Sequence, residues 1–227
     1  MVILLQKILL IVTLIIIAGC AQSKNFSYGI QEINKLNSKY GTTMETYPKN
    51  IREINLMLNE FKELKKLELE NGKEPFNYVI DYKILNLESE NLYIESQKYG
   101  SAATTKKGFG CKSRPFILES VALRNQSAKK GFEAVDLLRE FNRKYPKEAD
   151  SVGLSEKAAM FLNATFYIID NDAIKDSNTI NRFCSKNRTL EIYQEELRKK
   201  TNLSEESIKK LSYEEAVDIW KQLREAD

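Results

Sequence analysis

The stretch PFILESVALRNQSAKKGFEAVDLLREFNRKYP, residues 115–146, decides the fold class of this chain. Its apolar residues, among them Ile117, Val121 and Leu138, recur at three- and four-residue intervals, which is the spacing of one face of an α-helix. A proline suits the first turn of a helix, and the second proline, Pro146, marks its end. The segment therefore predicts one long amphipathic helix.

Three further segments, which cover residues 48–70, 75–99 and 155–183, show the same apolar period. Two of them open with a proline, Pro48 and Pro75, and alternating β-branched runs are nearly absent. Because the links between the segments are short, neighbouring helices are expected to be antiparallel. The sequence predicts an all-α fold: an up-down antiparallel bundle of about four long helices with a short helical C-terminal tail.

The last long segment and the tail carry their own local signals. In residues 155–183, the expected core stripe includes Phe161, Leu162 and Ile168. In the tail, Ser204 is a predicted N-cap, and Ser212 with Glu215 matches a capping box. The tail, residues 187–227, is predicted to be a helical hairpin, either packed on the bundle or joined loosely to it.

Composition limits the chemistry. The chain has 227 residues, no His and three Cys. Without imidazole, neither a Ser-His-Asp nor a Cys-His catalytic arrangement can form, and a histidine metal cage is excluded. A formal net charge of +3 is close to balance and argues against a dedicated nucleic-acid binder. We expect no cofactor, no metal and no catalytic residue.

The N-terminus has the features of an export signal. Residues 8–19, ILLIVTLIIIAG, are apolar except for Thr13, and a run of this length is short for a membrane span, which needs roughly 20 residues. The tetrapeptide Ile17-Ala18-Gly19-Cys20 that closes it resembles the lipobox of prokaryotic lipoproteins. The resemblance implies that Cys20 receives a thioether-linked diacylglyceryl group and becomes the first residue of the mature chain. The alternative is an uncleaved signal anchor that begins at Val2.

These features predict four parts of the chain: a signal peptide (1–19), the lipidated Cys and tether (20–46), a helical bundle (47–186) and the C-terminal hairpin (187–227). The expected location is extracytoplasmic and membrane-anchored, through lipid on Cys20, at a cell or outer membrane.

Two cysteines remain, Cys111 and Cys184. An even number in an exported chain suggests a disulfide. The up-down topology independently places both residues at one end of the bundle, since Cys111 precedes the third helix and Cys184 ends the fourth. A disulfide between them is predicted, and two free thiols are the alternative.

Basic residues gather before the third helix. Residues 98–147 hold 12 basic and 4 acidic side chains, whereas residues 44–97 hold 7 and 11, so the helices of the two segments are expected to pair through complementary charges. The preceding loop, with Lys106, Lys107, Lys112 and Arg114, is a candidate anion-binding site for a phosphate, a carboxylate or an acidic lipid head group.

The sequence favours a non-enzymatic binding or scaffolding module of the cell envelope, with an envelope protein as its partner. Two alternatives stay open. One is an envelope carbohydrate-acting enzyme with Asp/Glu acid-base chemistry, which needs no His. The other is a helical receptor for a small hydrophobic ligand, which would need a large cavity in the bundle.

Overall fold

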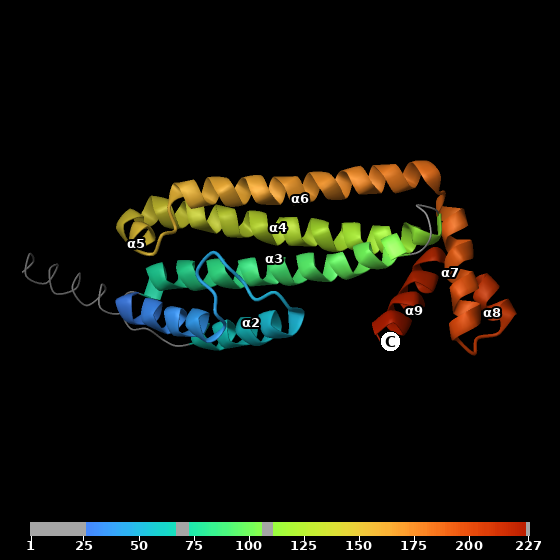
Figure 1. Ribbon diagram of the computed structural model, residues 1–227, viewed down its shortest axis with the longest axis horizontal. Coiled ribbons are helices and arrows are strands. Elements are labelled where there is room, and N and C mark those ends of the chain that lie inside the picture. The colour runs from blue at the N-terminus through green and yellow to red at the C-terminus, as the bar shows by residue number, and fades with distance from the viewer. Residues whose placement is uncertain (1–25, 67–72, 106–110, 226–227) are drawn as a thin grey trace, which may run out of the picture. The chain divides into compact units, whose positions relative to one another are not determined.

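The computed structural model describes residues 26–66, 73–105 and 111–225, and within these ranges the regular structure is helical, with no β-strand. The all-α prediction is confirmed. Residues 26–39 form the first helix. The later elements are α2 (Ile51–Lys65), α3 (Lys73–Thr105), the short 3-10 helix η1 (Cys111–Ser113), α4 (Arg114–Lys144), α5 (Pro146–Ser151), α6 (Glu156–Phe183), α7 (Lys186–Lys200), α8 (Glu205–Lys210) and α9 (Tyr213–Glu225) (Figure 1).

Two predicted helix boundaries are wrong. The prediction that Pro48 opens a helix fails because α2 begins at Ile51, where the side chain of Asn50 accepts a hydrogen bond from the Glu53 amide at 2.8 Å. This Asn is the stronger start signal. The prediction that the next helix ends near Gly100 also fails, since α3 continues to Thr105. A glycine weakens a helix without breaking it when packing continues beyond it, and Ala103 is buried here.

The C-terminal helices start at the predicted caps. Ser204 accepts a hydrogen bond from the Ser207 amide at 3.1 Å. Ser212 and Glu215 form the reciprocal bonds of a capping box, at 3.2 Å from the Glu215 amide and 2.8 Å from the Ser212 amide. The tail is not a two-helix hairpin, because it contains α7, α8 and α9.

The chain divides into two compact units. Unit 1 comprises residues up to Ile94 together with Gln126–Ile168, and unit 2 comprises Glu95–Asn125 together with residues from Ile169 onward. The divisions fall inside α3, α4 and α6, so each unit contains part of each of these helices. The tail helices α7, α8 and α9 belong to unit 2.

In unit 1, contacts link the helices in chain order. Lys39 and Glu60 join residues 26–39 to α2 at 2.6 Å, and Lys62 and Glu88 join α2 to α3 at 3.0 Å. Between α3 and α4, Lys130 approaches Glu88 at 3.3 Å, which agrees with the expected charge complementarity for this one pair of helices. The core of unit 1 is apolar and includes Ile33, Ile54, Met57, Phe61, Phe76, Val79, Ile80, Leu87, Ala134, Leu138, Phe141, Leu154 and Ala159.

The helices α4 and α6 approach closely in unit 1. The Phe132 and Phe166 rings meet edge to face, with centroids 6.2 Å apart. Gly131 lies so close to the Phe166 ring that a Cβ atom at this position would overlap it. The missing side chain of Gly131 therefore makes room for the aromatic ring.

Unit 2 is built around aromatic side chains. Trp220 of α9 meets Phe116 of α4 and Tyr193 of α7 edge to face, at centroid distances of 5.1 and 5.4 Å. The Trp220 indole N–H donates to the Glu196 carboxylate at 2.9 Å. These contacts explain why the tail packs with the ends of the long helices.

Candidate functional site

The predicted disulfide is present in unit 2. Cys111 and Cys184 are bonded, with their Cα atoms 5.4 Å apart. The bond joins η1, at the start of α4, to the residue that follows α6. The topological reasoning that brought both cysteines to one end of the helices is therefore confirmed.

The candidate anion-binding residues separate into three groups. Lys106 and Lys107 lie outside the described residues, as does the predicted lipidation site Cys20. Lys112 is exposed. Arg114 is buried, and its guanidinium donates to Thr189 Oγ1 at 2.6 Å and to Asn181 Oδ1 at 2.7 Å. The Arg114 side chain thus ties α4 to α6 and α7 inside unit 2, in place of the expected surface position.

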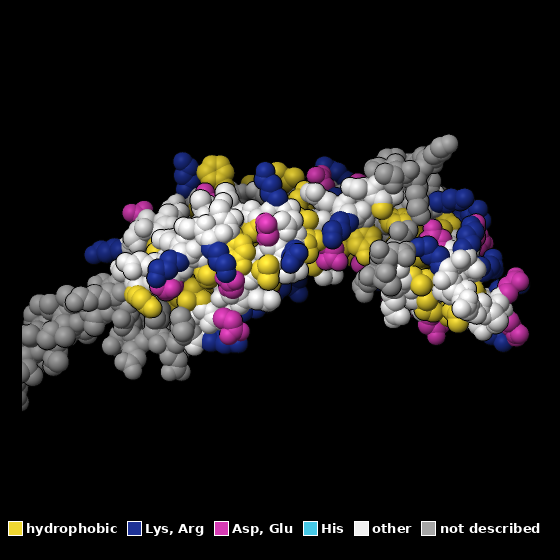
Figure 2. Space-filling view, turned by 60° about the horizontal axis from the view of Figure 1, so that its bottom comes forward, with side chains coloured by type: hydrophobic (Ala, Val, Ile, Leu, Met, Phe, Trp, Pro, Cys, Tyr) yellow, Lys and Arg dark blue, Asp and Glu magenta, His cyan; other side chains and the backbone are white. Residues whose placement is uncertain are grey.

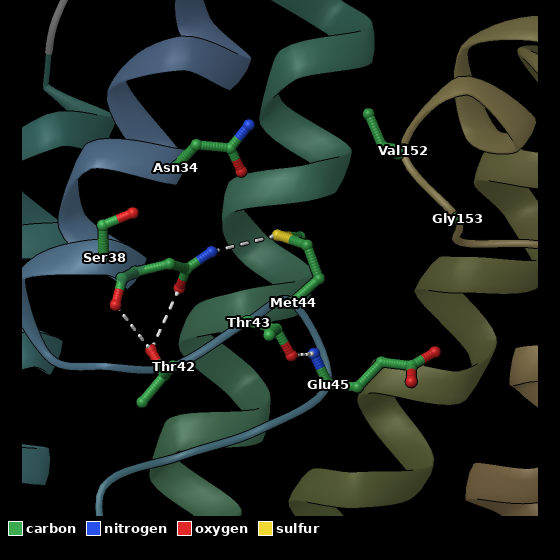
Figure 3. Close-up of a pocket in the computed structure, with 9 residues that line it drawn as sticks. Asn34, Ser38, Thr42, Thr43, Met44, Glu45, Val152 and Gly153 are labelled. Atoms are coloured by element: carbon green, nitrogen blue, oxygen red, sulfur yellow. Dashed lines mark hydrogen bonds between the residues drawn. The ribbon is translucent and has the colours of Figure 1, made fainter.

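A pocket of about 410 Å³ opens on unit 1. Figure 3 shows Asn34 and Ser38 on one side, the segment 42–45 below them, and Val152 and Gly153 opposite. The lining residues are mostly polar: Asn34, Asn37, Ser38, Thr42, Thr43, Met44, Glu45, Val152 and Gly153. The alternative of a hydrophobic-ligand receptor predicted an enclosed apolar cavity, and this pocket has a different character.

Asn37 holds the turn that forms one wall of the pocket. Its side chain is buried and accepts a hydrogen bond from the Thr42 hydroxyl at 3.4 Å, while its amide N–H lies 3.5 Å from the Met44 sulfur (Figure 3). The turn contains Gly41 at a φ of +62°, a conformation that glycine adopts at little cost. The amides, hydroxyls and the Glu45 carboxylate of this pocket can hydrogen-bond a small polar molecule.

A buried lysine lies beneath the same segment. Lys83 of α3 has no exposed surface, and its ammonium donates to the carbonyl oxygens of Thr43 and Thr46, the latter at 3.1 Å. It also lies 4.5 Å from the centre of the Tyr47 ring. Burial lowers the pKa of Lys83 to about 7, because desolvation disfavours its charged form. Lys83 therefore fastens segment 43–47 to α3.

Burial shifts other groups of unit 1 in the same sense, toward the neutral form. Burial raises the pKa of Glu90 and of the hydroxyl of Tyr82. The Tyr82 hydroxyl is buried and has no hydrogen-bond partner among the described residues. Across residues 26–66, 73–105 and 111–225, no three Cys, Asp or Glu side chains come together as metal ligands.

The spacing of apolar residues in the sequence indicates that position 83 is buried, although lysine is usually an exposed residue. Position 83 follows Phe76, Val79 and Ile80 at helical spacing, so it falls on the apolar stripe of α3. A charged residue on such a stripe is expected to find buried partners.

The outward side of α6 is the second feature of unit 1. Met160, Phe161, Tyr167 and Ile168 are 64, 66, 62 and 60% exposed, and Ala164 between them is exposed as well. We call these five residues the outer α6 face. Figure 2, in which the lower side of Figure 1 comes forward and α6 turns away from the viewer, shows apolar side chains interspersed with Lys, Arg, Asp and Glu side chains on that side of the molecule.

The outer α6 face corrects the predicted core stripe. Phe161 and Ile168 were expected in the core, but the buried residues of α6 are Ala159, Phe166, Ala173 and Ile180. These recur every seven residues on the opposite side of the helix. Because both sides of α6 are apolar, helical spacing alone could not identify the inward one.

No protein family model matches the sequence, and neither the curated proteins nor the solved structures include a match. None of the described helices has the length and the apolar composition required to cross a membrane.

Proposed function

We propose that the protein is a membrane-anchored lipoprotein, attached through Cys20, and that its extracytoplasmic part is a non-enzymatic binding or scaffolding module of the cell envelope. The observation that carries the binding role is the outer α6 face. Contiguous patches of large exposed apolar side chains mark interaction sites, whereas single exposed apolar residues are common on any protein surface. In unit 1 these side chains lie on one helix and within three turns of each other.

The Cys111–Cys184 bond supports export. Structural disulfides persist in oxidising compartments and are rare in the cytosol of mesophiles. The bond therefore agrees with the lipobox-like end of the N-terminal apolar run, where Cys20 would carry the lipid. Two acyl chains give durable attachment to a bilayer, whereas a single chain gives marginal binding.

Anchoring is tested with the Cys20→Ala variant of the full chain. The wild-type chain is expected to sediment with membranes and to incorporate labelled fatty acid, and Cys20→Ala is expected to lose the label. A Cys111→Ala/Cys184→Ala variant is the matched control, because it removes the two disulfide-bonded cysteines and leaves Cys20 in place. Unchanged labelling of Cys20→Ala contradicts the anchor.

The binding role is tested by chemical cross-linking in intact membranes. Phe161→Glu, on the outer α6 face, is expected to abolish the major cross-linked product. Leu56→Glu on α2 is the control, since Leu56 is also apolar and is 48% exposed. Products that are equal in both variants would show that the outer α6 face does not bind the partner.

A further inference from the structure

The outer α6 face has a symmetric pattern. Counted from Ala164, its large residues stand at positions −4, −3, +3 and +4: Met160, Phe161, Tyr167 and Ile168. The helix is therefore bulky on both sides of a small central residue. A two-fold axis through Ala164 would superpose each large position on another large position.

We infer that the outer α6 face binds the same face of a second copy of this chain, with the two α6 helices antiparallel and the two-fold axis at Ala164. A two-fold interface needs a surface that is complementary to itself, because the same patch is used on both copies. Here Met160 and Phe161 of one copy would lie beside Ile168 and Tyr167 of its partner. The small Ala164 lets the helices approach to the usual interaxial distance of about 8–10 Å. The inference names the partner in the binding role proposed above, and it rests on that role.

Charge does not oppose this pairing. The five residues of the face are uncharged, so no like charges meet across the axis. The ammonium of Lys157 lies 5.9 Å from the centre of the Phe161 ring of its own helix. Lys157 is exposed at the start of α6, beyond the large residues, which is where the polar rim of an interface is expected.

The exposed area fits a weak dimer. A large side chain can bury roughly 150–250 Å², so the exposed parts of the four large side chains amount to about 500 Å² per copy and about 1,000 Å² for a pair. Specific interfaces bury about 1,200–2,000 Å² in total, and transient ones lie below that range. We therefore expect association that depends on concentration and is reversible.

The test uses cysteine cross-linking of the full chain in intact membranes. In Ala164→Cys, the two introduced thiols would face each other at the axis, so mild oxidation is expected to give a disulfide-linked dimer on a non-reducing gel. Met160→Cys is the matched control on the same face. In an antiparallel pair its two thiols are offset by eight residues, about 12 Å along the helix, which a disulfide cannot bridge.

A second pair of variants tests the apolar contact. Adding Phe161→Glu to Ala164→Cys is expected to reduce the dimer at least tenfold, whereas adding Leu56→Glu is expected to leave it unchanged. Both introduced charges are at exposed positions, and circular dichroism with a thermal scan verifies that each variant is folded. Sedimentation velocity of the full chain in mild detergent is expected to show a monomer–dimer shift with concentration that Phe161→Glu removes.

The outcomes separate the inference from the proposed function. A dimer from Ala164→Cys but not from Met160→Cys supports the antiparallel pair. Equal dimer from both overturns it. A product of another mass that depends on Phe161 overturns the second copy as partner but leaves the binding role standing. No product of either kind, with the variants folded, overturns both.

Discussion

Lys83 offers the sharpest test of the physical reasoning about unit 1. Its side chain is fully buried, and burial lowers its pKa from 10.5 to about 7. In the unfolded chain the same amine keeps its ordinary pKa. Between pH 7 and pH 10.5 the unfolded state therefore binds a proton that the folded state does not, so the free energy of unfolding rises with pH in this window. Below pH 7 both states are charged, and the full cost of burying the ammonium is present.

The change to make is Lys83→Met, which keeps the length of the side chain and removes its charge. The quantity to follow is the free energy of unfolding of the wild type minus that of the variant, measured by urea titration at pH 7, 8 and 9. One pKa unit corresponds to 1.36 kcal/mol, and Lys83 is already half deprotonated near pH 7 in the folded state, so the difference is expected to rise by about 2 kcal/mol from pH 7 to pH 9.

The difference between the two proteins cancels the titration of all groups that they share. Ile80→Val is the matched control, because it perturbs the same buried stripe without removing a titratable group, and its difference from the wild type is expected to stay flat with pH. A flat difference for Lys83→Met as well would refute the reasoning. It would mean that the carbonyls of Thr43 and Thr46 and the Tyr47 ring compensate the ammonium fully for its lost hydration.

Three further predictions concern packing and cross-linking. Replacing Cys111 and Cys184 by Ser, or reducing the bond, should lower the free energy of unfolding by about 4 kcal/mol by the loop-entropy estimate, as measured by denaturant titration; a loss below 1 kcal/mol would contradict it. Gly131→Ala should cost about 1–3 kcal/mol by overpacking against the Phe166 ring, and the cost should shrink when Phe166→Leu is added; additive effects in a double-mutant cycle would contradict the contact. Trp220→Ala should lower the free energy of unfolding by about 3–5 kcal/mol. Because the tail shares one core with the ends of the long helices in unit 2, calorimetry should show no separate unfolding transition for the tail; a separate low-temperature transition would contradict the shared core.

Most of the fold follows from local signals in the sequence. The apolar spacing at Ile117, Val121 and Leu138 of α4 identifies buried residues correctly, because an amphipathic helix turns its apolar side toward the core. The disulfide follows from topology, since antiparallel neighbours bring the start of one helix beside the end of the next. The caps at Ser204 and Ser212 follow from side chains that satisfy free backbone N–H groups.

The candidate sites were harder to predict, for two different physical reasons. On α6 both sides satisfy the helical period, and the choice between them depends on fit: Ala159 and Ala173 are small enough for close helix packing, whereas Phe161 and Ile168 are left outside. At Lys83 the partners are backbone carbonyls of residues that lie about 40 positions earlier in the chain, at separations of 40 and 37. A backbone carbonyl has no residue-type signature, so no pattern in the sequence could name it.

The proposed anchor and the outer α6 face would reinforce each other. A face of about 500 Å² per copy gives weak association between molecules that diffuse freely in three dimensions. Lipid on Cys20 would confine both copies to one membrane surface and raise their effective concentration, as a linker does for joined binding modules. Disrupting the anchor should therefore weaken the dimer without touching α6, and the Ala164→Cys product should fall in a Cys20→Ala background while the unfolding of the domain is unchanged. An undiminished product in that background would mean that the face is sufficient by itself, and that the membrane contributes nothing to the pairing.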